Sequence, residues 1–269
     1  MVQSITLPNG VTLQCVEHGR ASGAPVILLH GLGDSWRSFE AVLTRLPPTI
    51  RAVAVTLRGH GDASRPEHYS FETMASDVVQ LMDAVGLTAA VVVGHSMGSV
   101  VAQHLAVLAP DRVLGLVLIG GFATLEGDPR VQASWQSTVS ALDDPVDPAF
   151  VRAFQASTLT RPVPASWLDG VVAESLKLPA RVWRALWRMH LDSPACVGAR
   201  GSGPVPTTLL WGDDDAFVPR QQQERLQTLW PGARLRIYAG HGHALHWEAP
   251  GRCAADIVAS VFERRTNRA

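Results

Sequence analysis

The stretch that decides the fold is AAVVVGHSMGSVVAQHL, residues 89–105. Its short apolar start lacks alternation, which is typical of a strand buried on both faces. Gly94-His95-Ser96-Met97-Gly98 follows at once, matches the pattern Gly-x-Ser-x-Gly, and leads into apolar residues at helical spacing. A serine on so tight a strand-to-helix turn projects its hydroxyl where the helix N-terminus favours developing negative charge. We therefore expect Ser96 to be a nucleophile rather than part of a plain glycine-rich turn.

Buried strands and amphipathic helices alternate on both sides of this stretch. The segments 25–31, 52–57 and 113–120 are short and apolar, and 36–46, 73–85 and 99–110 have helical spacing. Residues 10–19 alternate between apolar and polar and predict an edge hairpin strand. Such alternation predicts an α/β fold with a mostly parallel sheet covered by helices on both faces.

The alternation is interrupted between Gly121 and the next apolar strand, 207–211. A crossover needs only about 10–12 residues, so the excess predicts a separate substructure. Helical patterns near 130–142, 148–159, 166–177 and 180–192 indicate a helical cap. The predicted organisation is a core of residues 1–121 and 204–269 with a cap of residues 122–203 inserted between core strands.

The composition excludes several classes of protein. The chain has 269 residues, of which 46% are hydrophobic and 17% charged, and a formal net charge of -1, so we expect no nucleic-acid or membrane partner. The first residues lack a signal peptide pattern, and no segment reaches the roughly 18 apolar residues of a membrane span. Three widely spaced cysteines favour free thiols in a reducing compartment, so we expect a cytoplasmic protein.

A second glycine-rich loop, His30-Gly31-Leu32-Gly33-Asp34, follows the strand at 25–31. An acyl-transfer site needs two N–H donors aimed at the oxyanion, one from the residue after the nucleophile and one from such a loop. We expect the backbone N–H groups of Leu32 and Met97 to form this oxyanion hole. His30 is interpreted as architectural.

Two further loops follow the strands at 207–211 and 234–240. The first holds three consecutive carboxylates, and the second, GHGHALHWE at 240–248, holds His241, His243 and His246. A serine hydrolase needs one carboxylate and one histidine, and the chain order serine, acid, histidine is that of this sheet type. The residues alone leave the choice within each loop open, and they leave open a metal site on the three histidines.

Together, the motifs HGLGDSW, RGHGDASRP, GHSMGS, GDDDAFVP and GHALHWEAP resemble the α/β-hydrolase fold superfamily over essentially the whole chain. Within it, they resemble the branch of capped bacterial serine esterases, haloperoxidase-like enzymes and C–C hydrolases. The resemblance implies a sheet of the eight-stranded type found in this family. It also implies that Asp215 is the acid and that His243, which Glu248 follows five residues later, is the base. It implies that Asp213 and Asp214 are turn or capping residues, and that Arg58 and His60 hold their loop rather than react.

Differences between the motif residues of this chain and those of related enzymes narrow the range of reactions that we expect. Epoxide hydrolases and haloalkane dehalogenases of this fold use an aspartate nucleophile, whereas this chain has Ser96. Meta-cleavage C–C hydrolases have Asn before the nucleophile and Trp after the catalytic histidine, where this chain has His95 and Ala244.

The predicted function is hydrolysis of a carboxylic ester or lactone of a small to medium, apolar substrate through an acyl-enzyme on Ser96, without metal or cofactor. The alternatives are a C–C hydrolase, perhydrolase or haloperoxidase-like enzyme on the same triad, a slow ligand receptor, and a metalloenzyme. The oligomeric state stays open. Aromatic side chains in or beside the predicted cap are candidates for substrate binding: Phe122, Trp135, Trp183 and Trp187.

Overall fold

In the computed structural model, which describes residues 1–196 and 205–266, eight strands form a sheet in the order β1-β2-β4-β3-β5-β6-β7-β8. β1 and β2 run antiparallel to their neighbours, and the remaining pairs are parallel. The predicted mostly parallel, eight-stranded α/β fold is therefore confirmed. In chain order the strands are β1 Val2–Thr6, β2 Thr12–His18, β3 Ala24–Leu29, β4 Ile50–Thr56, β5 Ala90–His95, β6 Val113–Ile119, β7 Thr207–Gly212 and β8 Arg234–Tyr238.

The strand expected at the edge of the sheet lies one position inside it. β2 pairs with β4 on one side and with β1 on the other, so the outermost strand is β1. Most of β1 is exposed, and its sequence carries little of the apolar alternation that marks a half-buried strand. The expectation for residues 10–19 was therefore wrong about the edge.

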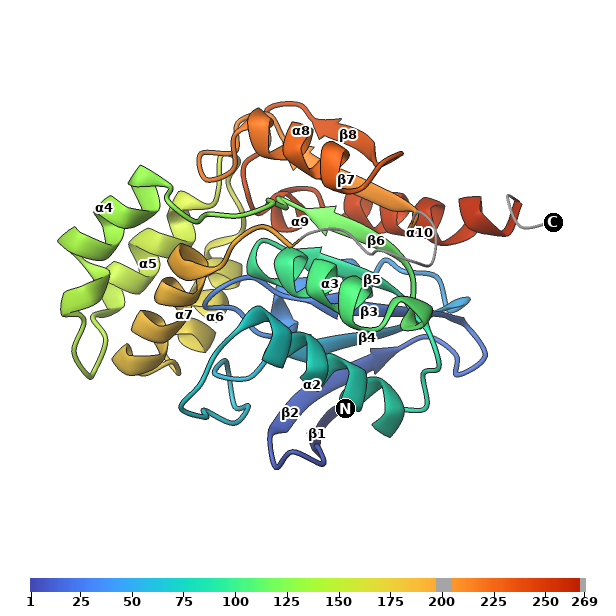
Figure 1. Cartoon of the computed structure of the whole chain (residues 1–269), viewed down its shortest axis with the longest axis horizontal. Helices are drawn as coiled ribbons and strands as arrows, with labels where there is room; N and C mark the ends of the chain where they lie inside the picture. The colour runs from blue at the N-terminus through green and yellow to red at the C-terminus, as the bar shows by residue number, and fades with distance from the viewer. Residues whose placement is uncertain (197–204, 267–269) are drawn as a thin grey trace.

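Helices cover both faces of the sheet, because successive side chains of each strand point to opposite sides. In β5, Ala90 and Val92 pack into one buried cluster, and Val91 and Val93 pack into another. The first cluster lies under α2 (Phe71–Ala84), α3 (Met97–Leu108) and α8 (Arg220–Leu229), which are at the front of Figure 1. The second lies under η1 (Trp36–Phe39), α1 (Glu40–Leu43), α9 (Leu245–Glu248) and α10 (Pro250–Thr266).

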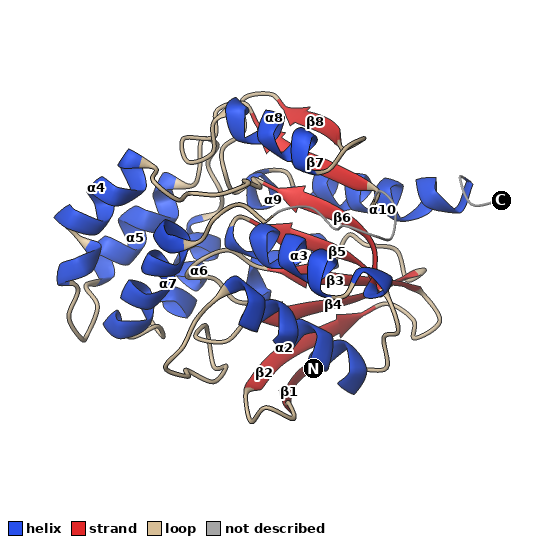
Figure 2. Ribbon diagram, in the orientation of Figure 1, coloured by secondary structure: helices blue, strands red, loops and turns tan. Residues whose placement is uncertain are grey.

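A group of helices separates β6 from β7 in the chain and lies at one end of the sheet (Figure 2). Asp128 and Asp147 cap the first and the second α-helix of the group by accepting hydrogen bonds from backbone N–H groups, and a proline follows each. The division into core and cap stays a prediction, and its boundary between residues 203 and 204 lies outside the described residues. The elements are α4 Pro129–Ser137, η3 Val139–Ala141, α5 Pro148–Ser157, α6 Ala165–Ser175 and α7 Ala180–Asp192; the short η2, Pro110–Arg112, precedes β6.

None of the helices in the described ranges has the length and apolar character needed to cross a membrane.

Candidate active site

Ser96 occupies a strained turn between β5 and α3. Its backbone has φ 50° and ψ -116°, and it is the only non-glycine residue with positive φ in the described part of the chain. Side chains at the two flanking glycines would collide with backbone. A Cβ atom on Gly94 would lie 2.2 Å from the carbonyl oxygen of Gly98, and one on Gly98 would lie 2.2 Å from that of Leu29. Both glycines of the motif are thus required by the turn that presents Ser96.

His243 and Asp215 meet at the carboxyl ends of β8 and β7. Nδ1 of His243 lies 2.8 Å from Oδ2 of Asp215, and both side chains are almost completely buried. The other carboxylate oxygen accepts hydrogen bonds from the backbone N–H groups of Phe217 and Val218, at 2.8 and 2.9 Å. The carboxylate of Asp215 is therefore held by its own loop. Nδ1 of His243 carries the proton of the contact with Asp215, so Nε2 of His243 is free to accept a proton.

The neighbouring carboxylates have other surroundings. Asp213 is exposed and accepts a hydrogen bond from the backbone N–H of Gly240, which links the acid loop to the start of the histidine loop. Asp214 is also exposed. Asp213 and Asp214 are therefore exposed to solvent, whereas the side chain of Asp215 is buried against His243.

The three histidines of the loop after β8 point to different partners. Nδ1 of His241 donates to the carbonyl of Ala239 at 2.9 Å, and Nε2 of His246 lies 2.9 Å from the hydroxyl of Ser38. His243 alone of the three contacts a carboxylate within hydrogen-bond distance, that of Asp215. Among the residues that the structure describes, no three His, Cys, Asp or Glu side chains are grouped so that they could hold a metal ion.

The two predicted oxyanion donors flank this site. Met97 is the first residue of α3, where N–H groups have no acceptor within the helix. Leu32 lies in the loop after β3 and lines the same pocket as Ser96. Gly33 has φ +82°, and a Cβ there would lie 2.9 Å from the ring of Trp183, so the loop next to Leu32 depends on glycine.

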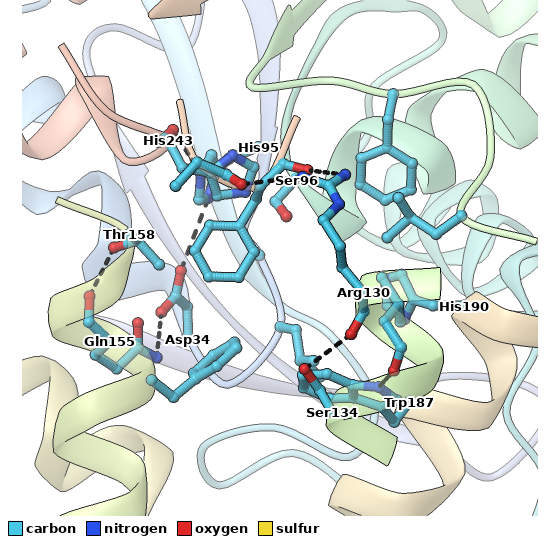
Figure 3. Close-up of a pocket in the computed structure, with 18 residues that line it drawn as sticks. Asp34, His95, Ser96, Arg130, Ser134, Gln155, Thr158, Trp187, His190 and His243 are labelled. Atoms are coloured by element: carbon cyan, nitrogen blue, oxygen red, sulfur yellow. Dashed lines mark hydrogen bonds and ion pairs between the residues drawn. The ribbon is translucent and has the colours of Figure 1, made fainter. Parts of the chain in front are cut away.

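Ser96 and His243 open into one cavity of about 200 Å³. Figure 3 shows Asp34, Gln155 and Thr158 on one side of it, and Arg130, Ser134, Trp187 and His190 on the other. Apolar side chains form much of the remaining wall: Leu32, Phe122, Leu125, Val131, Phe154 and Phe217. The cavity therefore suits a small, largely apolar group with a few polar contacts.

Two of the four aromatic candidates line this cavity, namely Phe122 and Trp187. Trp183 is fully buried and packs edge-to-face against Phe150 and Phe154, so it supports the wall from behind. Trp135 lies outside the lining, with the guanidinium group of Arg188 5.4 Å from its ring centroid. For Trp183 and Trp135 the structure therefore shows packing contacts and no place in the cavity lining.

The loop after β4 braces the loop of residues 30–34, called the oxyanion loop because it holds the predicted donor Leu32. Nε2 of His30 accepts the backbone N–H of Leu57 at 3.0 Å, and its Nδ1 donates to Gly31 at 2.7 Å. Arg58 forms a buried bidentate ion pair with Asp77 of α2, with both N–O distances 2.6 Å. These contacts match the architectural interpretation of His30 and Arg58.

Several cavity residues were missed by sequence reasoning. Gln155 and Arg130 lie on α5 and α4 and carry no motif, so only their folded position reveals them. Phe217 packs against the ring of His243 with centroids 5.2 Å apart. Asp34 carried a detectable signal, since it is an acidic residue in a loop at the carboxyl end of a strand. Burial raises the pKa of Asp34 to about 8 and lowers that of His190 to about 4.

Comparison with known proteins agrees with this geometry. The sequence model of the alpha/beta hydrolase fold matches residues 24–250, which is most of the chain. The chain belongs to the α/β-hydrolase family. It is a hydrolase, and the predicted resemblance to this family is confirmed.

Relatives of this α/β hydrolase include esterases. The chain is 31% identical over 248 residues to a pimeloyl-[acyl-carrier protein] methyl ester esterase of Neisseria meningitidis serogroup C, covering 88% of this chain and 94% of that protein. It is 27% identical over 253 residues to esterase YbfF of Escherichia coli, covering 91% and 94%. The solved structure of an esterase from Exiguobacterium antarcticum matches with a TM-score of 0.85 at 23% identity, covering 97% and 99% of the two chains. The two esterases that are similar in sequence support ester hydrolysis as the general reaction, and the solved structure supports the fold.

Proposed function

We propose that this α/β hydrolase is a serine esterase that cleaves carboxylic esters through an acyl-enzyme on Ser96. The observation that carries the proposal is the buried 2.8 Å contact of His243 with Asp215 beside a strained Ser96. A serine hydroxyl is a weak nucleophile unless a base with a fixed tautomer accepts its proton. The Asp215 contact supplies that fixed tautomer.

The reaction then proceeds in two steps. Nε2 of His243 takes the proton of Ser96 as the hydroxyl oxygen attacks the ester carbonyl, and the N–H groups of Leu32 and Met97 stabilise the oxyanion. The imidazolium returns its proton to the alcohol oxygen as that bond breaks. Water, activated by His243 in the same way, releases the acid from Ser96. The base, the nucleophile and the oxyanion donors of this scheme are all residues of the chain.

The proposed substrate is a small to medium ester or lactone with an apolar portion. The cavity of about 200 Å³ and its apolar wall, which includes Phe122 and Trp187, favour such a group. A related protein is named for a methyl ester, a substrate with a small alcohol. A short-chain ester is therefore a suitable first substrate.

We also propose that the protein works in the cytoplasm. Its cysteines, Cys15, Cys196 and Cys253, are free and buried, as expected for a protein that folds in a reducing compartment. Subcellular fractionation tests this directly, and recovery in an oxidising compartment would contradict it.

The test of the esterase is Ser96→Ala assayed with p-nitrophenyl butyrate. We expect at least a thousandfold loss of kcat/KM with an unchanged fold, because the nucleophile is removed and only binding and oxyanion contacts remain. Ser99→Ala, a buried serine three residues further on, is the matched control and should keep activity. An aryl phosphonate should label the wild type on Ser96 in equimolar amount. Undiminished turnover by Ser96→Ala would overturn the proposal.

A further inference from the structure

Asp34 is a buried carboxyl group close to the proposed nucleophile. Its side chain is 3% exposed and lines the same cavity as Ser96. Oδ1 accepts a hydrogen bond from Nε2 of Gln155 at 3.1 Å, and Oδ2 accepts one from the hydroxyl of Ser38 at 3.1 Å. Both donors are neutral, so they offset only part of the cost of burying a negative charge there.

His95 precedes the proposed nucleophile and faces this carboxyl group. Nε2 of His95 lies 3.3 Å from the backbone carbonyl oxygen of His243. A carbonyl oxygen can only accept, so Nε2 carries the proton and Nδ1 of a neutral ring has a bare lone pair. Nδ1 is buried and has no hydrogen-bond partner, and it lies 3.9 Å from Oδ2 of Asp34 (Figure 3).

An ionised Asp34 does not suit this geometry. A carboxylate oxygen and an imidazole lone pair would face each other without a proton, at a place where Nδ1 of His95 is buried. One additional proton between Oδ2 and Nδ1 removes the repulsion and supplies the missing hydrogen bond after a small closing movement. The proton count is the same whether that proton is drawn on oxygen or on nitrogen.

We propose that Asp34 and His95 share one proton and act as a positioning pair that joins the oxyanion loop, the nucleophile turn and the loop of His243. Asp34 follows Leu32 in the first loop, His95 precedes Ser96 in the second, and Nε2 of His95 holds the third through the carbonyl of His243. The role in catalysis rests on the proposed esterase function, whereas the shared proton does not.

The surrounding titratable groups favour the proton on Asp34. The groups that face the pair are histidines: His30 from the end of β3, His243 from its loop, and His246 from α9, whose ring centroid lies 4.2 Å from that of His95. Burial, with His246 and His243 close by, holds the pKa of His95 well below its usual range. Burial raises the pKa of Asp34 to about 8. Within the described ranges, His95 is also the only basic side chain within 4 Å of the Asp34 carboxylate.

Loss of this proton to solvent at alkaline pH has a defined consequence. The carboxylate of Asp34 then repels Nδ1 of His95. This repulsion displaces the His95 ring and weakens its hydrogen bond to the carbonyl oxygen of His243. Small displacements of reacting groups lower rates strongly. We expect kcat/KM of the wild type to fall by roughly tenfold with a midpoint near pH 8.

The first test compares pH profiles of kcat/KM for wild type, Asp34→Asn and Asp34→Leu. Asparagine places a permanent N–H donor against Nδ1 and keeps an oxygen for Gln155, so this variant should stay within about fivefold at pH 7 and lack the fall near pH 8. Leucine offers no donor and should be slower by roughly tenfold across the range. Asp214→Asn, at an exposed acid, should reproduce the wild-type profile. A fall with the same midpoint in Asp34→Asn would overturn the proposal.

The second test needs no turnover. Nitrogen-15 NMR of histidine-labelled resting enzyme, with His95 assigned through a His95→Gln variant, reports both ring nitrogens. We expect a protonated Nε2, and a hydrogen-bonded Nδ1 whose shift changes between pH 7 and 9 in wild type and stays constant in Asp34→Asn. A constant Nδ1 shift in wild type would refute the shared proton. If the enzyme hydrolyses no ester while the NMR titration appears, the proposed function fails and the proton pair stands.

Discussion

Glu248 accepts a hydrogen bond from the backbone N–H of Gly242 at 2.9 Å, one residue before His243. Its other carboxylate oxygen accepts the N–H groups of Thr160 and Arg161 from the segment between α5 and α6, at 2.6 and 2.9 Å. One side chain thus fixes the histidine loop to a segment far away in the sequence. This contact gives a physical reason for a glutamate five residues after the proposed base.

Replacing Glu248 should therefore affect catalysis through position. Glu248→Ala leaves three N–H groups without their acceptor, so we expect kcat to fall by roughly tenfold or more and the free energy of unfolding to fall by about 2 kcal/mol. Glu248→Gln keeps one acceptor oxygen and should lose less. Ester hydrolysis and urea denaturation measure the two effects, with the exposed Glu67→Gln as control. An Ala variant with wild-type kcat would show that the loop holds its place without Glu248.

The histidine loop should respond very unequally to substitution. His243→Ala removes the proposed base and should lower kcat/KM by about a thousandfold or more. His241→Ala removes a ring whose Nδ1 bonds only the backbone of Ala239, so the loss should be within about fivefold. The same ester assay compares both variants after circular dichroism has verified their folds. Comparable losses would mean that the base has been assigned to the wrong histidine.

The ion pair of Arg58 with Asp77 should be important for stability rather than chemistry. Asp77 is 1% exposed, and Asp77→Asn would leave the guanidinium charge buried without its partner, so we expect a loss of about 3–5 kcal/mol. Glu224→Gln breaks an exposed pair with Arg220 on α8 and should cost less than about 1 kcal/mol. Urea denaturation of the two variants provides the comparison. Equal losses would show that burial does not set the difference between these two ion pairs.

Buried histidines should make the fold sensitive to acid. Burial lowers the pKa of His60 and of His190 to about 4 from 6.5. As the pH falls from 6.5 to 4, the unfolded chain takes up protons at these rings and the folded chain does not, so stability is lost across this window. Each ring accounts for roughly 3 kcal/mol.

The measurement is the free energy of unfolding between pH 7 and 4. His190→Gln should reduce the dependence on pH in this range, whereas His68→Gln, at an exposed position, should leave it unchanged. A His190→Gln slope that equals the wild-type slope would show that His190 titrates normally in the folded protein.

Local patterns explain why much of the fold could be predicted from the sequence. Strand burial, helix spacing and the two glycines around Ser96 depend on residues that are close in the chain, because backbone geometry repeats over two to four residues. The carboxyl ends of parallel strands meet at one edge, so the loops of Leu32, Ser96, Asp215 and His243 could be placed together in advance. β1, with its weak alternation, and the short helix α9 inside the expected histidine loop escaped this reasoning.

Contacts across the fold were decided by the tertiary structure alone. The 3.9 Å approach of Asp34 to His95, and the choice between Trp187 in the cavity wall and Trp183 behind it, depend on how separate elements pack. No periodicity in the sequence encodes such distances, since they join residues dozens of positions apart. The sequence by itself therefore determined the scaffold and, with the resemblance to the family, pointed to the proposed reacting groups, whereas the packing of loops and helices determined the surroundings of those groups.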